Sequence, residues 1–231
     1  IIGDVNEMGI SVTSSDVTIA HLSVQSTRNG VAVYDATNVV LDDLIIEEAG
    51  QFAIALDGSQ VTLQNLLLAQ NPAGAIQAEG SQLTLSGSQL LDNTGYGLKL
   101  ADSSADISTT AISGVLVPTE SDDYDGTCVY AEDSTGVISM DTVQMSFCQR
   151  VGAYTFDSDL AITNSSIEES SNGVVGIIGG EEMFSTITDN YLSQVSGYGI
   201  YVIGQDSEVS RNTVTTTNAA YGNSYGIMVA N

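Results

Sequence analysis

Apolar and polar residues alternate along this chain in short blocks, and the blocks repeat every 22 residues between Val17 and Ile112. Each block contains an apolar–polar–apolar triplet such as Val17-Thr18-Ile19, and alternation with a period of two is typical of β-strands. The equivalent apolar positions form three columns: Val17, Val39, Val61, Leu83 and Ala105; Ile19, Leu41, Leu63, Leu85 and Ile107; Val24, Ile46, Leu68, Leu90 and Ile112. A period of this length indicates stacked repeats that bury one another's apolar faces.

Each repeat holds three short strands separated by turns rich in Gly, Ser, Asn and Asp, and no segment has the periodicity of a helix. If the chain coils, every strand pairs in parallel with its counterpart one repeat later, and the apolar columns fill the interior. We therefore expect an all-β parallel β-helix, or β-solenoid, of about ten coils of roughly 22 residues. Because the repeat that opens at Gly226 is not completed, we expect residues 1–231 to be a single β-helix domain within a longer chain.

The repeat resembles the right-handed parallel β-helix superfamily, the fold of pectate lyases and of many bacterial surface proteins. The resemblance is carried by glycine-led strands such as Gly199-Ile200-Tyr201-Val202 and by an Asn-x-Ile-like step at Asn190-Tyr191-Leu192 and Asn212-Thr213-Val214. It implies a right-handed, single-stranded coil with a ladder of inward asparagines at one turn. The equivalent column here carries asparagine only at Asn190 and Asn212, so we expect the ladder only near the C-terminal end.

One insertion breaks the period, because Ile107 and Met140 are 33 residues apart and the extra residues lie at 115–125. Function is often carried by loops on a rigid scaffold. Set against the twelve-residue calcium loop, the sequence places oxygen ligands at Ser121, Asp123, Asp125 and Glu132, with Asp122 as a further candidate. Serine stands where the pattern expects a carboxylate, and the alternative is a solvated acidic loop. The only cofactor that the sequence suggests is therefore Ca²⁺.

Cys128 and Cys148 are 20 residues apart, which is close to the length of one coil. That spacing can place them in neighbouring coils at the distance that a disulfide needs. Two buried thiols are the alternative.

Four residues are candidates for ligand binding on the outside of the solenoid. Strand alternation places Tyr201 and Lys99 outward, Tyr154 is a further candidate, and Tyr124 lies in the insertion. Outward aromatic rings on a flat sheet can stack against sugar rings. Isolated surface tyrosines are common, so this pattern alone does not define a site.

The charge of the chain excludes several partners. It carries 29 acidic and 4 basic residues, for a net charge of -25, and such a chain repels nucleic acid and anionic membrane surfaces. It also lacks an apolar run of about 18 residues, so we expect no membrane insertion by this segment.

The sequence contains no recognisable catalytic motif, and no catalytic residue is assigned. We expect a secreted or cell-surface β-helix with a structural or binding role, adhesive or directed at carbohydrate. Its expected partners are polysaccharide, other surface proteins or further β-helix coils stacked end to end. The alternative is a carbohydrate-active enzyme, a polysaccharide lyase or glycoside hydrolase, with its site near the insertion at 115–132.

Overall fold

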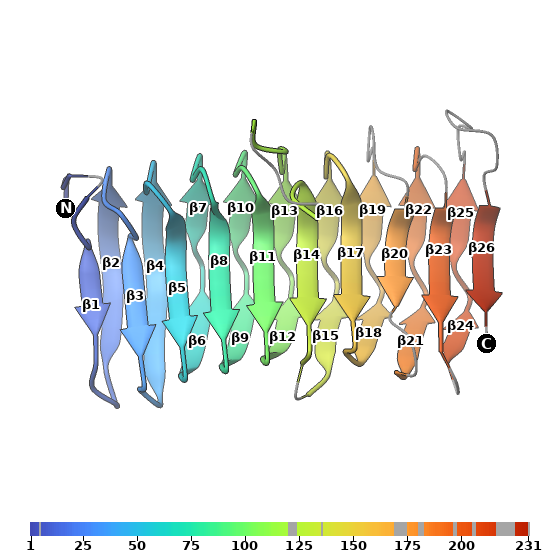
Figure 1. The fold of residues 1–231 in the computed structure, drawn as a ribbon, viewed down its shortest axis with the longest axis horizontal. Coiled ribbons are helices and arrows are strands. Elements are labelled where there is room, and N and C mark those ends of the chain that lie inside the picture. The colour runs from blue at the N-terminus through green and yellow to red at the C-terminus, as the bar shows by residue number, and fades with distance from the viewer. Residues whose placement is uncertain are drawn as a thin grey trace.

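The structure is a computed structural model that describes residues 1–4, 6–119, 124–134, 136–168, 175–179, 183–195, 198–204, 207–215 and 225–230. For residues 175–179 and 225 it describes the backbone alone. The described elements are all strands, and every pairing between them is parallel. The coils stack along one long axis (Figure 1). The predicted all-β parallel β-helix is confirmed.

The first strand of each coil joins a ten-stranded sheet that covers one side of the solenoid (Figure 1). Its members are β1 (Ile10–Val12), β3 (Val31–Tyr34), β5 (Phe52–Asp57), β8 (Gly74–Glu79), β11 (Tyr96–Ala101), β14 (Thr127–Glu132), β17 (Val151–Phe156), β20 (Val175–Gly179), β23 (Tyr198–Ile203) and β26 (Tyr225–Ala230). We call this sheet the first face.

The remaining strands form a sixteen-stranded sheet that bends around a corner of the solenoid. Two long strands, β2 (Thr18–Gln25) and β4 (Val39–Glu47), run through the corner in the first coils. Later coils break there into two strands. The second face contains β6 (Gln60–Gln64), β9 (Gln82–Ser86), β12 (Ser104–Ser108), β15 (Ile138–Asp141), β18 (Leu160–Thr163), β21 (Ser185–Thr188) and β24 (Glu208–Ser210). The third face contains β7 (Leu67–Ala69), β10 (Gln89–Leu91), β13 (Ala111–Ser113), β16 (Gln144–Ser146), β19 (Ser166–Glu168), β22 (Tyr191–Ser193) and β25 (Thr213–Thr215).

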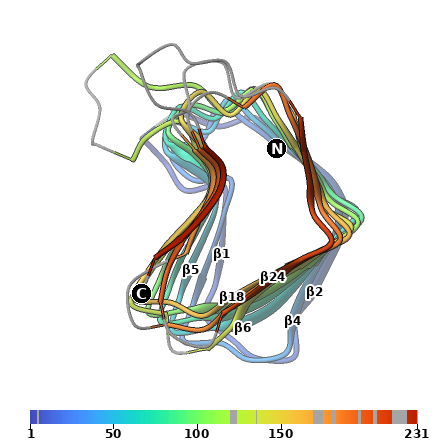
Figure 2. The ribbon, with the colours of Figure 1, turned by 90° about the vertical axis from the view of Figure 1, so that its right-hand side faces the viewer.

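The register follows the period of the sequence. Leu63 pairs with Leu41 on one side and Leu85 on the other, in steps of 22 residues. Ile107 pairs with Met140, so the insertion lies outside the strands and the columns continue beyond it. Viewed along the axis in Figure 2, the coils lie one behind another, and the green segments beside the insertion leave the shared outline.

The three predicted columns form the core. Their members in the central coils are between 0% and 3% exposed. Val17 and Ile19 are only partly buried, because they belong to the first coil and are covered from one side.

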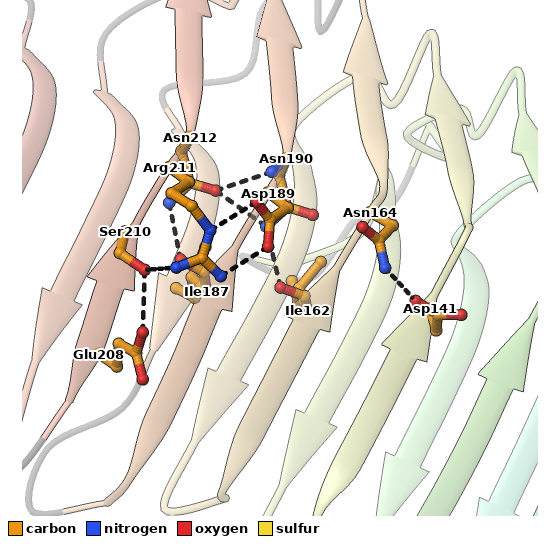
Figure 3. Close-up of polar contacts among 10 residues, drawn as sticks. All are labelled: Asp141, Ile162, Asn164, Ile187, Asp189, Asn190, Glu208, Ser210, Arg211 and Asn212. Carbon is orange, nitrogen blue, oxygen red and sulfur yellow. Dashed lines mark hydrogen bonds and ion pairs between the residues drawn. The ribbon is translucent and has the colours of Figure 1, made fainter.

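One residue in each coil turns the chain between the second and third faces. It adopts the left-handed conformation at, for example, Asp43, Asn65 and Asn164, with φ between 49° and 56°. Aspartate, asparagine and glycine tolerate this conformation best, which explains why the turns are rich in them. Polar contacts link these corner residues from coil to coil: Arg211 forms an ion pair with Asp189, and Asn164 donates to Asp141 (Figure 3).

The predicted asparagine ladder is present at this corner. Asn190 donates through Nδ2 to Asn212 Oδ1 at 3.0 Å (Figure 3). The expectation that such a ladder occurs only near the C-terminal end is wrong, however. Asn71 and Asn93 form a second ladder at the corner that follows the third face, where Asn71 Nδ2 donates to Asn93 Oδ1 at 2.8 Å. Both are fully buried, and their 22-residue spacing was the signal in the sequence.

Candidate functional site

The outer surface of the first face carries a column of polar and aromatic side chains beside the insertion. The register places Gln77, Lys99, Tyr130 and Tyr154 at equivalent positions of β8, β11, β14 and β17. Parallel strands are about 4.8 Å apart, so neighbouring members of this column are within contact distance. Lys99 and two tyrosines are thus brought together by pairing between coils.

Four tyrosines pack against one another here, and we call this group, with Lys99, the tyrosine platform. The rings of Tyr130 and Tyr154 are stacked, with centroids 5.6 Å apart and an angle of 3° between their planes. Tyr124, at the end of the insertion, lies 5.2 Å from Tyr130 and 4.9 Å from Tyr154. Tyr96 lies 5.5 Å from Tyr130, and the Lys99 ammonium is 5.0 Å from the centre of the Tyr96 ring. Aromatic and cation–π contacts at these distances are favourable.

The platform has a buried part and an open part. Tyr96 and Tyr130 are each 5% exposed, whereas Tyr124 is 40% exposed and Tyr154 is half-buried. The hydroxyl of Tyr130 donates to Glu132 Oε2 at 2.8 Å. Burial and this hydrogen bond raise the pKa of Tyr130 above its usual value, so it remains a neutral phenol at physiological pH. The rings available to a ligand are therefore those of Tyr124 and Tyr154.

The chain around Tyr124 is held to the coils on both sides. Thr127 Oγ1 donates to the carbonyl of Tyr124 at 2.6 Å, and the Gly126 amide donates to the carbonyl of Gly95 at 2.6 Å. Gly126 has a φ of 88°, and a side chain there would collide with Val117. These contacts fix the position of Tyr124 over the first face.

A disulfide lies directly beneath the platform. Cys128 of β14 is bonded to Cys148 of the next coil, with a Cα–Cα distance of 5.5 Å, and both residues are fully buried. The bond joins two consecutive coils on the C-terminal side of the insertion.

The calcium ligands expected in the insertion are only partly described. Ser121, Asp122 and Asp123 lie outside the described residues. Asp125 is 7% exposed, and Glu132 accepts the hydrogen bond from Tyr130. Among the residues that the structure describes, no group of three or more His, Cys, Asp or Glu side chains is placed to hold a metal ion.

Of the four predicted ligand-binding residues, three meet in the platform. Tyr201 lies in the same outward column, two strands beyond Tyr154, where its ring is 5.3 Å from that of Tyr198. Sequence reasoning missed Tyr96 and Tyr130. Tyr130 is 31 residues after Lys99 and 24 before Tyr154, so the insertion hides an alignment that would otherwise show as a 22-residue repeat.

A second hollow, of about 300 Å³, lies on the second face. Its described lining is polar and aliphatic, with amide, hydroxyl and carboxylate groups from Gln60, Gln82, Thr62, Thr84 and Asp106 among others. It offers no aromatic ring or basic group to a ligand. The platform is the stronger candidate.

Comparison with known proteins agrees with the fold. The profile of a family described as the right handed beta helix region matches residues 8–134, which is more than half of the chain. The chain belongs to this right-handed β-helix family. The predicted handedness is therefore confirmed. No curated protein sequence matches the chain significantly.

Two solved structures are similar to this right-handed β-helix. An alginate lyase from Paenibacillus sp. str. FPU-7 superimposes with a TM-score of 0.54 and 13% identity, over 99% of this chain and 78% of the lyase. The pentapeptide repeat protein HetL, involved in heterocyst differentiation regulation in the cyanobacterium Nostoc sp. strain PCC 7120, matches over 89% of this chain and 90% of its own. Its TM-score is 0.22 and its identity 11%. The likeness to the lyase shows a shared fold. Within the described part of the β-helix, no helix is long and apolar enough to span a membrane.

Proposed function

We propose that this β-helix binds a neutral polysaccharide on the tyrosine platform, as a structural or adhesive protein outside the cell or at its surface. The observation that carries the proposal is the exposed pair Tyr124 and Tyr154, whose ring centroids are 4.9 Å apart on an otherwise flat sheet. Flat aromatic surface presents an apolar face to a sugar ring while hydroxyl and ammonium groups at its edge remain wet. Lys99, in the same outward column, supplies a hydrogen-bond donor beside the rings.

The surroundings of the platform favour a neutral glycan over a polyanion. Glu79, Ala101 and Glu132 occupy the column next to Gln77, Lys99 and Tyr130, so two carboxylates flank the single ammonium group. The whole chain adds a net charge of -25. A polyuronide would meet this field without enough basic groups to offset it and would need bridging cations.

The disulfide supports a location outside the cytoplasm. Stable disulfides are typical of secreted and surface proteins, because the cytosol keeps thiols reduced. Cys128 and Cys148 are bonded and fully buried in the core under the platform. An oxidising compartment is therefore the environment in which we propose that the protein works.

Glycan binding tests the proposal directly. We expect the protein to bind at least one neutral soluble polysaccharide in a panel of glucans, mannans, xylans and galactans. Tyr124→Ala or Tyr154→Ala should weaken that binding about tenfold or more, since losing a stacked ring costs on the order of 1.4 kcal/mol. Tyr191→Ala is the matched control, because Tyr191 is a 45% exposed tyrosine of the third face.

Two results would contradict the proposal. One is equal binding by the Tyr124, Tyr154 and Tyr191 variants, which would place the contact elsewhere. The other is cleavage, read in the same samples as new reducing ends or as absorbance of unsaturated uronate. Cleavage would replace the binding role with that of a polysaccharide lyase or glycoside hydrolase near residues 115–132.

A further inference from the structure

The tyrosine platform contains more ring-to-ring contact than a sugar-binding surface uses. Tyr124, Tyr130 and Tyr154 contact one another in all three pairings, at centroid distances of 4.9, 5.2 and 5.6 Å. Tyr130 is buried, so its ring faces other tyrosines instead of solvent. Three phenols in mutual contact can exchange an electron as readily as they stack.

One of these phenols also has a proton acceptor in place. Tyr130 donates its hydroxyl hydrogen to Glu132 Oε2 at 2.8 Å. A phenol that loses an electron becomes strongly acidic, and a carboxylate already hydrogen-bonded to it can take the proton without any rearrangement. This contact makes Tyr130 the member of the cluster from which an electron and a proton leave together most easily.

We propose that Tyr124, Tyr130 and Tyr154 form an oxidation site at which a one-electron oxidant links Tyr124 to Tyr154 by a dityrosine bond. The inference is independent of glycan binding. Two equivalents of oxidant remove one electron and one proton from each of two phenols, leaving two phenoxyl radicals. The radicals join through a carbon–carbon bond between the ring carbons next to the hydroxyls. The hydrogen on each joined carbon then moves to its oxygen, so the product has two hydrogens fewer than the starting protein.

Geometry selects Tyr124 and Tyr154 as the partners that couple. Tyr130 is stacked face to face with Tyr154, at an angle of 3°, whereas an aryl–aryl bond joins ring edges. The ring of Tyr124 is tilted by 33° against that of Tyr154 and its centroid is nearer. Tyr124 also lies in a turn before β14 and is 40% exposed, so it can rotate more freely than a tyrosine of a buried strand. Tyr130 passes the radical on, and Tyr124 and Tyr154 keep it.

The bond would attach the end of the insertion to the next coil. Tyr154 is on β17 and Tyr124 precedes β14, so the link crosses between neighbouring strands, as the disulfide between Cys128 and Cys148 does in the interior. Oxidation would thus fix the platform rings relative to each other.

The test uses the folded protein, at low concentration, with a photo-oxidised ruthenium(III) bipyridyl complex as the oxidant. We expect dityrosine fluorescence, an intact mass lower by two hydrogens, a monomer on a denaturing gel, and a cross-linked peptide that contains Tyr124 and Tyr154. Tyr154→Phe should abolish this peptide while keeping the ring in the stack. Tyr201→Phe, which alters the separate Tyr198–Tyr201 pair at 5.3 Å, should leave its yield unchanged. Glu132→Gln should slow its formation severalfold without changing the pair that is joined.

Three outcomes would overturn the inference. They are an undiminished yield of intramolecular dityrosine in Tyr154→Phe, a cross-link distributed evenly over all exposed tyrosines, and a rate that is the same with Glu132→Gln as with wild type. Thermal unfolding of each variant separates these results from loss of the fold. Because glycan binding is measured before oxidation, failure of one proposal is distinguishable from failure of the other.

Discussion

Serine hydroxyls close the corner between the first and second faces. Ser59, Ser81 and Ser103 are buried at equivalent positions of three successive coils. The Ser81 hydroxyl accepts a hydrogen bond from the Ser59 amide of the preceding coil at 3.0 Å and donates to the carbonyl of Glu79 in its own coil at 2.8 Å. Ser103 repeats both contacts. A buried hydroxyl is inexpensive here because both of its hydrogen-bonding functions are used.

Ser185 is a buried serine in the opposite situation. It occupies the apolar core column, in register with Leu160, and its hydroxyl has no hydrogen-bond partner among the described residues. Ser185→Ala should raise the free energy of unfolding by about 1 kcal/mol, because it removes an unpaired buried polar group. Ser165→Ala should lower it by about the same amount, since Ser165 Oγ accepts from the Val143 amide and donates to the Thr163 carbonyl. Chemical denaturation measures both; equal losses of stability would show that the Ser185 hydroxyl is paired.

Asp141 gives the protein a local dependence on pH. Hydrogen bonds from Asn164 and then Thr163 lower the pKa of Asp141 from its ordinary value of 3.8. Its contribution to stability is therefore present above 3.8 and is lost as the pH falls through the lower pKa of the folded state. The thermal unfolding midpoint of Asp141→Ala should lie below that of wild type near neutral pH, and the gap should narrow below pH 3.8. Asp106→Ala, a change at an exposed carboxylate of the second face, corrects for the loss of one negative charge. A gap that is constant with pH would argue against this role of Asp141.

At the scale of the strand, the period of the sequence predicted the inward and outward positions. Leu63 is fully buried, and Thr62 beside it is half-buried and outward. Leu63→Ala should destabilise the protein by about 2–5 kcal/mol through lost burial and the cavity left behind. Thr62→Ala should cost well under about 1 kcal/mol, as is usual for surface positions. Denaturation midpoints compare the two; similar losses would mean that the register of β6 is wrong.

The same period explains what could not be predicted. Strand positions repeat because each coil must match the previous one, so Val39, Leu41 and Ile46 are recognisable from spacing alone. The tyrosine platform depends on where the chain re-enters the coil after the insertion, and the spacing of Tyr130 from its neighbours carries no repeat. Contacts between Tyr124 and the first face depend on the path of the insertion, which alternation of residue types does not determine. Local pattern therefore predicts the scaffold better than the site placed on it.

At the scale of the whole molecule, charge dominates the response to ions. The net charge of -25 repels itself in the folded state, so added salt should raise the unfolding temperature by screening. A specific calcium site in the insertion would add to this by binding only the folded protein. We expect millimolar calcium to stabilise the protein more than magnesium at equal ionic strength, and Asp123→Asn to remove that difference. Asp106→Asn is the matched control for charge. Equal effects of the two ions on wild type would leave the insertion as an acidic loop without a calcium site.

Hydrogen bonds between strands join each coil only to the coils immediately before and after it. Such a molecule can fold like a zipper, since a few stacked coils provide the template on which the next coil orders. Nearly all its contacts join residues about one coil apart in sequence, so no distant ends need to meet before folding can proceed. The unbroken block from Val17 to Ile112 is the natural starting point, and the insertion is the step at which growth must wait for a longer loop to close. The order of folding along the chain is thus written in the same spacing that builds the solenoid.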